Sequence, residues 1–88
     1  MDLNLANGFD IAPHAARQMQ HRGITEEQIE TALRTYHTDY PAEPLPRQRE
    51  QSTVYVGDLA GRELKVYVRD NSDPPYVRTA VWRGEEQG

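Results

Sequence analysis

The sequence predicts an α+β domain, with two N-terminal helices packed on a three- to four-stranded antiparallel sheet. Residues 13–36 carry apolar side chains at helical spacing, with a break near Gly23. Residues 52–83 contain three runs rich in valine and aromatic residues, separated by short turn-forming segments. Because 88 residues support one core, we expect a single domain over 1–88, with its core at about 9–83 and a flexible tail at 84–88.

Pro13 opens the first predicted helix. Proline suits a first helical turn because its missing N–H would have no partner within the helix there. Gly23 is expected to end this helix. Its apolar side is formed by Ala15, Ala16 and Met19. Its polar side, at three- and four-residue spacing, carries His14, Arg17, Gln18 and His21.

The second helix is predicted to begin after Thr25. Thr25 and Gln28 have the spacing of a capping box, and two glutamates fall in the first turn, where the helix dipole favours acids. Its buried side is expected to contain Ile29, Ala32, Leu33 and Tyr36. Residues 37–50 include three prolines and show little periodicity, so we expect a loop there.

Three strands are expected at 52–56, 63–69 and 76–83, and residues 9–11 are a candidate short edge strand. The hairpin-length segment 57–61 and the turn-rich segment 70–75 predict an antiparallel meander. Strict alternation assigns eight side chains to the face under the helices. They are Val54, Val56, Leu64, Val66, Val68, Val77, Thr79 and Val81.

The opposite face is predicted to interleave basic, aromatic and hydroxyl side chains. These are Thr53, Tyr55, Lys65, Tyr67, Arg69, Tyr76, Arg78 and Trp82. One interpretation is an RNA-binding surface, because cations suit phosphates and flat rings suit stacked bases. The alternative is an ordinary solvated face, since these residue types are common on the exposed side of antiparallel sheets.

Composition narrows the possible functions. The net charge of −4 argues against indiscriminate binding of nucleic acid through bulk charge. The absence of cysteine excludes disulfide scaffolds, thiolate zinc sites and thiol nucleophiles, and it fits a cytoplasmic location. No apolar run approaches the roughly 18 residues of a membrane span, so no membrane partner is expected.

A metal site and a cofactor are not expected either. His14 and His21 lie seven residues apart, which is about 10 Å along a helix, too far for direct ligation of one ion. The chain also contains no H-E-x-x-H motif.

Four segments together resemble a known family. Residues 11–19 read I-A-P-H-A-A-R-Q-M and are followed by R-G-I at 22–24, by G-R-E-L-K-V-Y-V at 61–68, and by V-R-T-A-V-W at 77–82. Their order and spacing resemble domain of unknown function 4258. The resemblance implies a RelE-like fold of the RelE/ParE-like toxin superfamily, a group that includes metal-independent ribonucleases. By position, it implies functional roles for His14, Arg17, Arg22 and Thr79.

Such a ribonuclease needs a base for the 2′-hydroxyl proton, a cation for charge on the phosphate, and an acid for the leaving oxygen. His14 can supply one proton role, and Arg17, one turn further on, can hold the phosphate. Thr79 is the third catalytic candidate. Candidate substrate contacts are Arg22, Arg62, Lys65, Tyr67, Arg78 and Trp82.

Two functions therefore stay open. One is a toxin-like, metal-independent endoribonuclease of a toxin-antitoxin system, with RNA and a cognate antitoxin protein as partners. The other is a non-catalytic RNA- or protein-binding module with a RelE-like fold. In the second case, His14 is a surface histidine or fastens the N-terminal segment. Arg22 has the alternative role of fastening the turn before Gly23.

Overall fold

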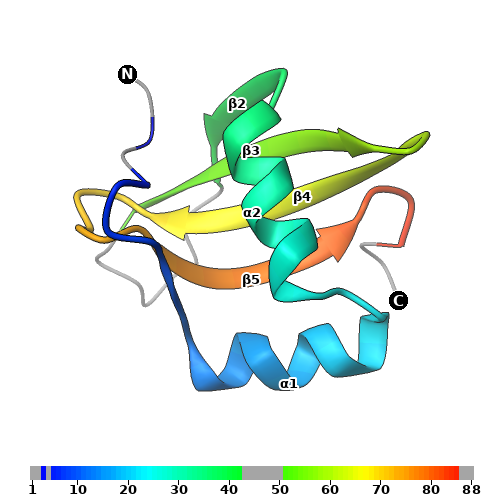
Figure 1. Cartoon of the computed structure of the whole chain (residues 1–88), viewed down its shortest axis with the longest axis horizontal. Helices are drawn as coiled ribbons and strands as arrows, with labels where there is room; N and C mark the ends of the chain where they lie inside the picture. The colour runs from blue at the N-terminus through cyan, green and yellow to red at the C-terminus, as the bar shows by residue number, and fades with distance from the viewer. Residues whose placement is uncertain (1–2, 4, 43–50, 86–88) are drawn as a thin grey trace.

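The computed structural model describes residues 3, 5–42 and 51–85 (Figure 1). The elements, in chain order, are β1 (Asp10–Ile11), α1 (Pro13–Arg22), α2 (Glu26–Thr35), β2 (Thr38–Pro41), β3 (Ser52–Leu59), β4 (Arg62–Arg69) and β5 (Tyr76–Trp82). The five strands of the described residues form one sheet in the order β1-β5-β4-β3-β2. β1 pairs with β5 in parallel, and the other neighbouring strands pair antiparallel. The α+β class and the predicted meander β3-β4-β5 are therefore confirmed, but the sheet is mixed and has more strands than predicted.

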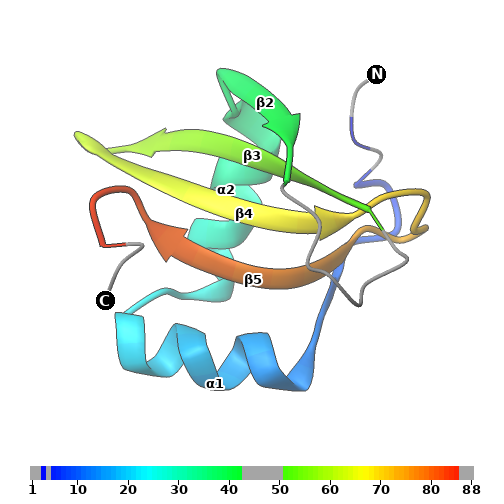
Figure 2. The same cartoon turned by 180° about the vertical axis from the view of Figure 1, so that it is seen from behind.

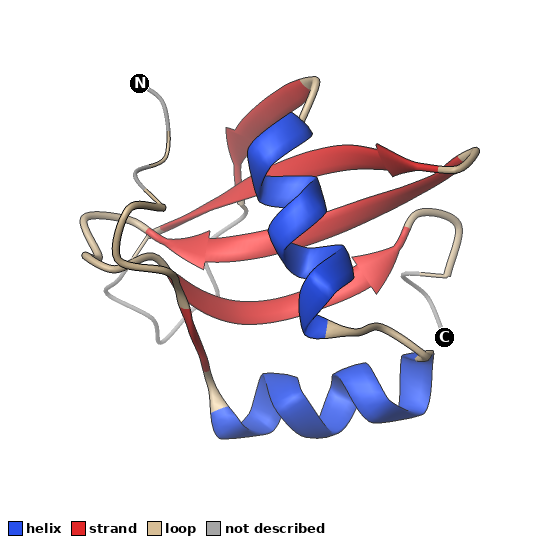
Figure 3. Cartoon of the chain, in the orientation of Figure 1, coloured by secondary structure: helices blue, strands red, loops and turns tan. Residues whose placement is uncertain are grey.

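The two helices lie differently on the sheet. α2 crosses one face and contacts β3 and β4, whereas α1 runs beside β5 (Figures 1 and 3). Seen from behind, the second face carries neither of the described helices (Figure 2). The two faces of the sheet are thus chemically distinct surfaces, and α1 lies along one margin.

Local signals placed the helix ends correctly. Gly23 adopts φ 68°, in the left-handed region, and ends α1. The Thr25 hydroxyl accepts a hydrogen bond from the Gln28 N–H at 3.2 Å, and the Gln28 side chain accepts from the Thr25 N–H at 3.0 Å. The capping box is therefore confirmed. The candidate edge strand near residues 9–11 is also confirmed, as β1.

The predicted loop at 37–50 is wrong in its first part. Residues 38–41 form β2, an edge strand that pairs Tyr40 with Val54. All four of its residues are exposed, so burial imposes no apolar alternation that the sequence could reveal. Residues 43–50 of that loop, and 86–88 of the predicted tail, lie outside the described residues.

The prediction that Val54 and Val56 face the helices is wrong. Val54 pairs with Tyr67 and Val56 with Lys65, so these valines lie on the second face. The helix side of β3 instead presents Tyr55 and Gly57. A Cβ atom at Gly57 would lie 2.7 Å from the Ala32 Cα of α2, so the helix packs directly on a glycine.

The assignment of faces in β5 is also wrong beyond its second residue. Tyr67 pairs with Thr79 and Val68 with Val77, which leaves Arg78 as the extra residue of a β-bulge. The bulge reverses the alternation, so Ala80 and Trp82 join the core instead of Thr79 and Val81. The core cluster contains Met19, Ile24, Ile29, Ala32, Leu33, Tyr55, Leu64, Val66, Val68, Val77, Ala80 and Trp82.

A cluster of ionic contacts joins Glu63 of β4 to His37, which precedes β2, and to Arg83, which follows β5. His37 Nε2 lies 2.8 Å from Glu63 Oε2, and the Arg83 guanidinium donates to the other carboxylate oxygen. The hydrogen bond from Arg83 lowers the pKa of Glu63 below its ordinary value of 4.5, and His37 acts in the same direction. The charged Glu63 therefore stabilises the folded state.

This cluster predicts a pH dependence of stability. Because the pKa of Glu63 is lower in the folded state, its contribution is present above pH 4.5 and is lost as the pH falls through the folded value. Glu63→Gln should remove the part of the fall in folding stability at low pH that is due to protonation of Glu63. Thermal unfolding midpoints measured between about pH 3 and about pH 6 test this. Parallel pH profiles for the variant and the wild type would contradict it.

Candidate functional site

α1 presents a polar strip next to its contact with the sheet. The helix buries Ala15 and Met19, while His14, Arg17 and His21 are exposed. Between these two sides lie Gln18 and Arg22, which are partly buried. His14, Gln18 and Arg22 are spaced four residues apart and therefore follow one another along the helix surface.

Arg22 fastens the end of α1 to β5. Its Nη1 donates to the Ala80 carbonyl at 2.8 Å and lies 3.4 Å from both the Thr79 hydroxyl and Gln18 Oε1. The Trp82 indole N–H donates to the Arg22 carbonyl at 3.0 Å. β1 pairs only with Tyr76 and Val77 at the start of β5. The Arg22 guanidinium therefore supplies a hydrogen-bond donor for the Ala80 carbonyl, which lies beyond β1 on the same edge. These contacts support a structural role for Arg22. It holds the end of α1 to β5, however, and does not fasten the turn before Gly23.

Removing this fastening should destabilise the fold. Arg22→Met keeps most of the aliphatic length but leaves the Ala80 carbonyl without its charged donor. We expect the free energy of unfolding to fall by about 2 kcal/mol, the usual range for hydrogen bonds to charged groups. Urea unfolding followed by circular dichroism measures this. Arg17→Met, an exposed change on the same helix, should shift the midpoint little, and equal effects would contradict the assignment.

Thr79 is the residue that the sheet places against the polar strip. Its hydroxyl donates to Gln18 Oε1, one helical turn after His14. Among the described residues, the side chains of His14 and Arg17 make no hydrogen bond or ion pair. Thr79 is therefore linked through Gln18 to the strip of α1 that carries His14, whereas Arg17 lies on the solvent side of the helix, away from the buried Ala15 and Met19.

The second face carries cations beside tyrosines. The Lys65 ammonium lies 5.9 Å from the Tyr40 ring centroid, and the Arg69 guanidinium lies 5.9 Å from that of Tyr76. Arg78 donates to the Ser52 hydroxyl at 3.2 Å. The cations and tyrosines on this face are Tyr40, Lys65, Tyr67, Arg69, Tyr76 and Arg78. We call it the cation–tyrosine face.

The composition of this face differs from the prediction. Thr53 and Tyr55 pair with Val68 and Val66, so they lie on the helix side. Tyr40 was missed, because it falls in the segment expected to be a loop. The run Thr38–Pro41 gives little indication of a strand, because all four residues are exposed and no apolar side chains alternate with polar ones.

The prediction that Trp82 lies on the exposed face is wrong. Trp82 is 4% exposed and packs in the core. The Arg62 guanidinium lies 4.1 Å from its ring centroid and also pairs with Glu85 at 2.7 Å. The β-bulge moves the indole under the helices, where no base could stack on it. Arg62 is therefore separated by the sheet from Lys65, Tyr67 and Arg78.

The motif order and the fold can now be compared with known proteins. A family model for a domain of unknown function, DUF4258, matches residues 11–82. This chain belongs to the DUF4258 family. The match runs from Ile11 in β1 to Trp82 at the end of β5, so the DUF4258 domain includes both helices and the sheet margin beside α1. No curated protein and no solved structure matches the chain.

The described residues of the DUF4258 domain contain neither a helix that could span a membrane nor a cluster of metal ligands. Neither α1 nor α2, the helices within the described residues, is long and apolar enough to cross a membrane. The described part of the domain contains no cluster of three or more histidine, cysteine, aspartate or glutamate side chains that could hold a metal ion.

Proposed function

We propose that this DUF4258 domain is a toxin-like, metal-independent endoribonuclease of a toxin-antitoxin system, related to the RelE/ParE-like superfamily. The observation that carries the proposal is the margin between α1 and β5. The side chains of His14 and Arg17 are exposed on α1 and have no partner among the described residues, while Gln18, one turn after His14, is bonded to Thr79 at this margin. Exposed polar side chains that lack an intramolecular partner are available to a ligand.

The proposed reaction is cleavage by the adjacent 2′-hydroxyl of RNA. His14 takes the 2′-hydroxyl proton while the 2′-oxygen attacks phosphorus and the bond to the 5′-oxygen breaks. Arg17 neutralises charge on the phosphate oxygens. The departing 5′-oxygen takes a proton from water at this exposed site. The products are a 2′,3′-cyclic phosphate and a 5′-hydroxyl, and Thr79 holds the margin in position through Gln18.

The cation–tyrosine face supports RNA as the substrate. Lys65, Arg69 and Arg78 can contact phosphates, and the neighbouring tyrosine rings can stack on unpaired bases. Each stacked base contributes about 1–3 kcal/mol without requiring a particular sequence. This arrangement favours single-stranded RNA despite the net charge of −4.

A second candidate function is a non-catalytic RNA- or protein-binding module. Two observations favour it. The cation–tyrosine face needs no reacting group in order to bind. In addition, three cavities in the described part of the domain are lined by residues other than His14, Arg17 and Thr79.

Incubation with RNA separates the two candidates. The purified domain is mixed with an end-labelled single-stranded RNA in the presence of a metal chelator. Cleavage that leaves cyclic phosphate ends, and that is absent when the RNA is replaced by the same sequence of DNA, supports the ribonuclease. Binding of the RNA with no cleavage would contradict the ribonuclease and support the module. Relief of growth arrest by a co-expressed neighbouring gene product would identify the antitoxin.

A further inference from the structure

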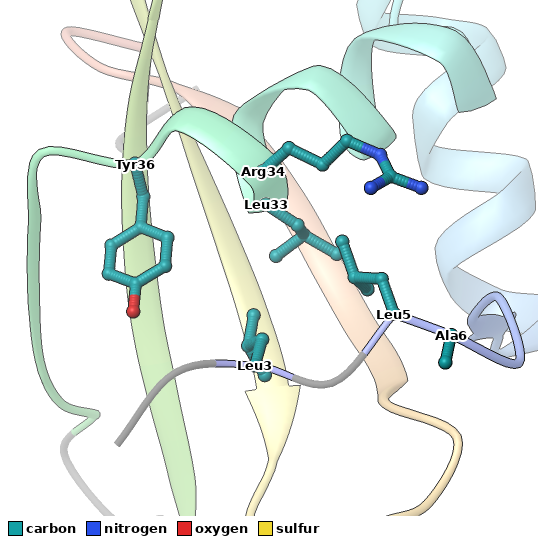
Figure 4. Close-up of a pocket in the computed structure, with 6 residues that line it drawn as sticks. All are labelled: Leu3, Leu5, Ala6, Leu33, Arg34 and Tyr36. Atoms are coloured by element: carbon teal, nitrogen blue, oxygen red, sulfur yellow. The ribbon is translucent and has the colours of Figure 1, made fainter.

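Two adjoining cavities lie on the helix side of the sheet. The first has a volume of about 640 Å³ and lies between the N-terminal segment and the end of α2 (Figure 4). The second, of about 470 Å³, lies at the ends of β3 and β4. Both are lined by Leu3, and Tyr36 of the first contacts Tyr55 of the second, with ring centroids 4.9 Å apart. We call the pair the Leu3 groove.

The first cavity of the Leu3 groove is lined by the apolar residues Leu3, Leu5, Ala6 and Leu33, together with Arg34 and Tyr36. Leu3 and Leu5 are only half-buried, and Leu5 points toward Leu33 of α2 (Figure 4). The Arg34 side chain extends away from these leucines and is bound to Glu30 at 2.9 Å. This half of the groove therefore offers the half-buried side chains of Leu3 and Leu5, and its one lining cation, Arg34, already has a partner.

The second cavity is acidic. It is lined by Asp39, Asp70 and Asp73, and none of these carboxylates forms an ion pair within the described part of the chain. Asp70 accepts a hydrogen bond from the Thr53 hydroxyl at 2.7 Å. Arg69 is the lining cation, and its guanidinium lies 5.9 Å from the Tyr76 ring. Three carboxylates against one guanidinium leave the cavity with net negative charge.

The hydroxyl of Tyr55 adds a donor to this cavity. Burial raises the pKa of Tyr55, and the nearby Tyr36, Asp39 and Asp70 raise it further. The group therefore stays protonated at neutral pH and keeps its hydrogen. The carboxylates, by contrast, have oxygen atoms free to accept hydrogen bonds. A guanidinium or ammonium group fits this combination of charge and acceptors.

We propose that the Leu3 groove binds a segment of a partner protein that carries a basic side chain next to an apolar one. The basic group occupies the cavity with the three aspartates, and the apolar group packs on Leu3 and Leu5. Charge complementarity selects this occupant over an acidic segment or a nucleic acid, whose phosphates the aspartates repel. This surface contains none of the proposed catalytic residues His14, Arg17 and Thr79, and it shares only Arg69 with the cation–tyrosine face.

A pair of synthetic peptides tests the proposal. One is a six-residue capped peptide of alternating leucine and arginine, and the other has glutamate in place of arginine. Titration into isotopically labelled full-length protein should shift the amide signals of residues 33–39 and 68–73 with the arginine peptide only. Asp39→Asn combined with Asp70→Asn should weaken binding at least about tenfold, since two charges are lost while the new amide at position 70 still offers an oxygen to Thr53.

Asp58→Asn is the matched control, because it removes one carboxylate of β3 that does not line the groove. It should leave the affinity unchanged. Equal binding of both peptides, unchanged affinity in the double variant, or shifts confined to other residues would overturn the proposal. Shifts at the groove that depend on protein concentration without peptide would show that a second copy is the occupant, which also overturns it. No RNA is used, so the outcome is independent of the ribonuclease proposal.

Discussion

Gly57→Ala is expected to lower the free energy of unfolding by about 3 kcal/mol, the upper end of the range for overpacked cores. The added methyl group would lie 2.7 Å from the Ala32 Cα and 2.9 Å from its Cβ. Both atoms belong to α2, so the helix as a whole must move away from β3. Such a movement would also loosen the packing of Ile29 and Leu33, which are almost fully buried.

A double-mutant cycle identifies the cause. Ala32→Gly alone should cost about 1 kcal/mol, because glycine is unfavourable within a helix. In the Gly57→Ala background the same change removes one of the two clashing atoms. The combined loss should therefore be smaller than the sum by about 1 kcal/mol. Chemical unfolding of the four proteins measures this, and additive losses would show that α2 does not approach Gly57 as closely as described.

His14→Ala is expected to reduce RNA cleavage by about 100-fold or more, the usual contribution of a general base. Arg17→Ala should reduce it by a similar factor, whereas Arg17→Lys should retain part of the rate because a charge remains near the phosphate. Both alanine variants should relieve growth arrest on expression. Initial rates with a labelled single-stranded RNA in chelator provide the measurement.

His21→Ala is the matched control for this series. It removes another exposed histidine of α1, two turns from His14, and should leave the cleavage rate unchanged. All three alanine variants alter exposed side chains, so their unfolding midpoints should match the wild type. Wild-type rates in both alanine variants would remove the α1–β5 margin as the reacting site. Loss of activity in His21→Ala alone would show that the reacting site lies near His21 and not near His14.

The helices could be predicted because their signals are local. Pro13 and Gly23 bound α1 through their own backbone preferences, and Thr25 bonds a residue only three positions away. The solvent exposure of His14 and Arg17 followed from the helical period in the same way. The distribution of cations and tyrosines on β4 was also correct, because the alternation Leu64, Val66, Val68 is regular.

The sequence by itself therefore determined the α+β class, both ends of α1, the start of α2, the meander and the exposure of His14 and Arg17. Only the tertiary structure decided which face of β3 lies under α2, since the absence of a side chain at Gly57 matters only once a helix approaches it. It also decided that Trp82 is buried in the core, because the β-bulge at Arg78, which sets the face on which Trp82 lies, depends on pairing with β4. The role of Arg22 depends on a carbonyl 58 residues away, at Ala80, which only the folded chain brings within reach.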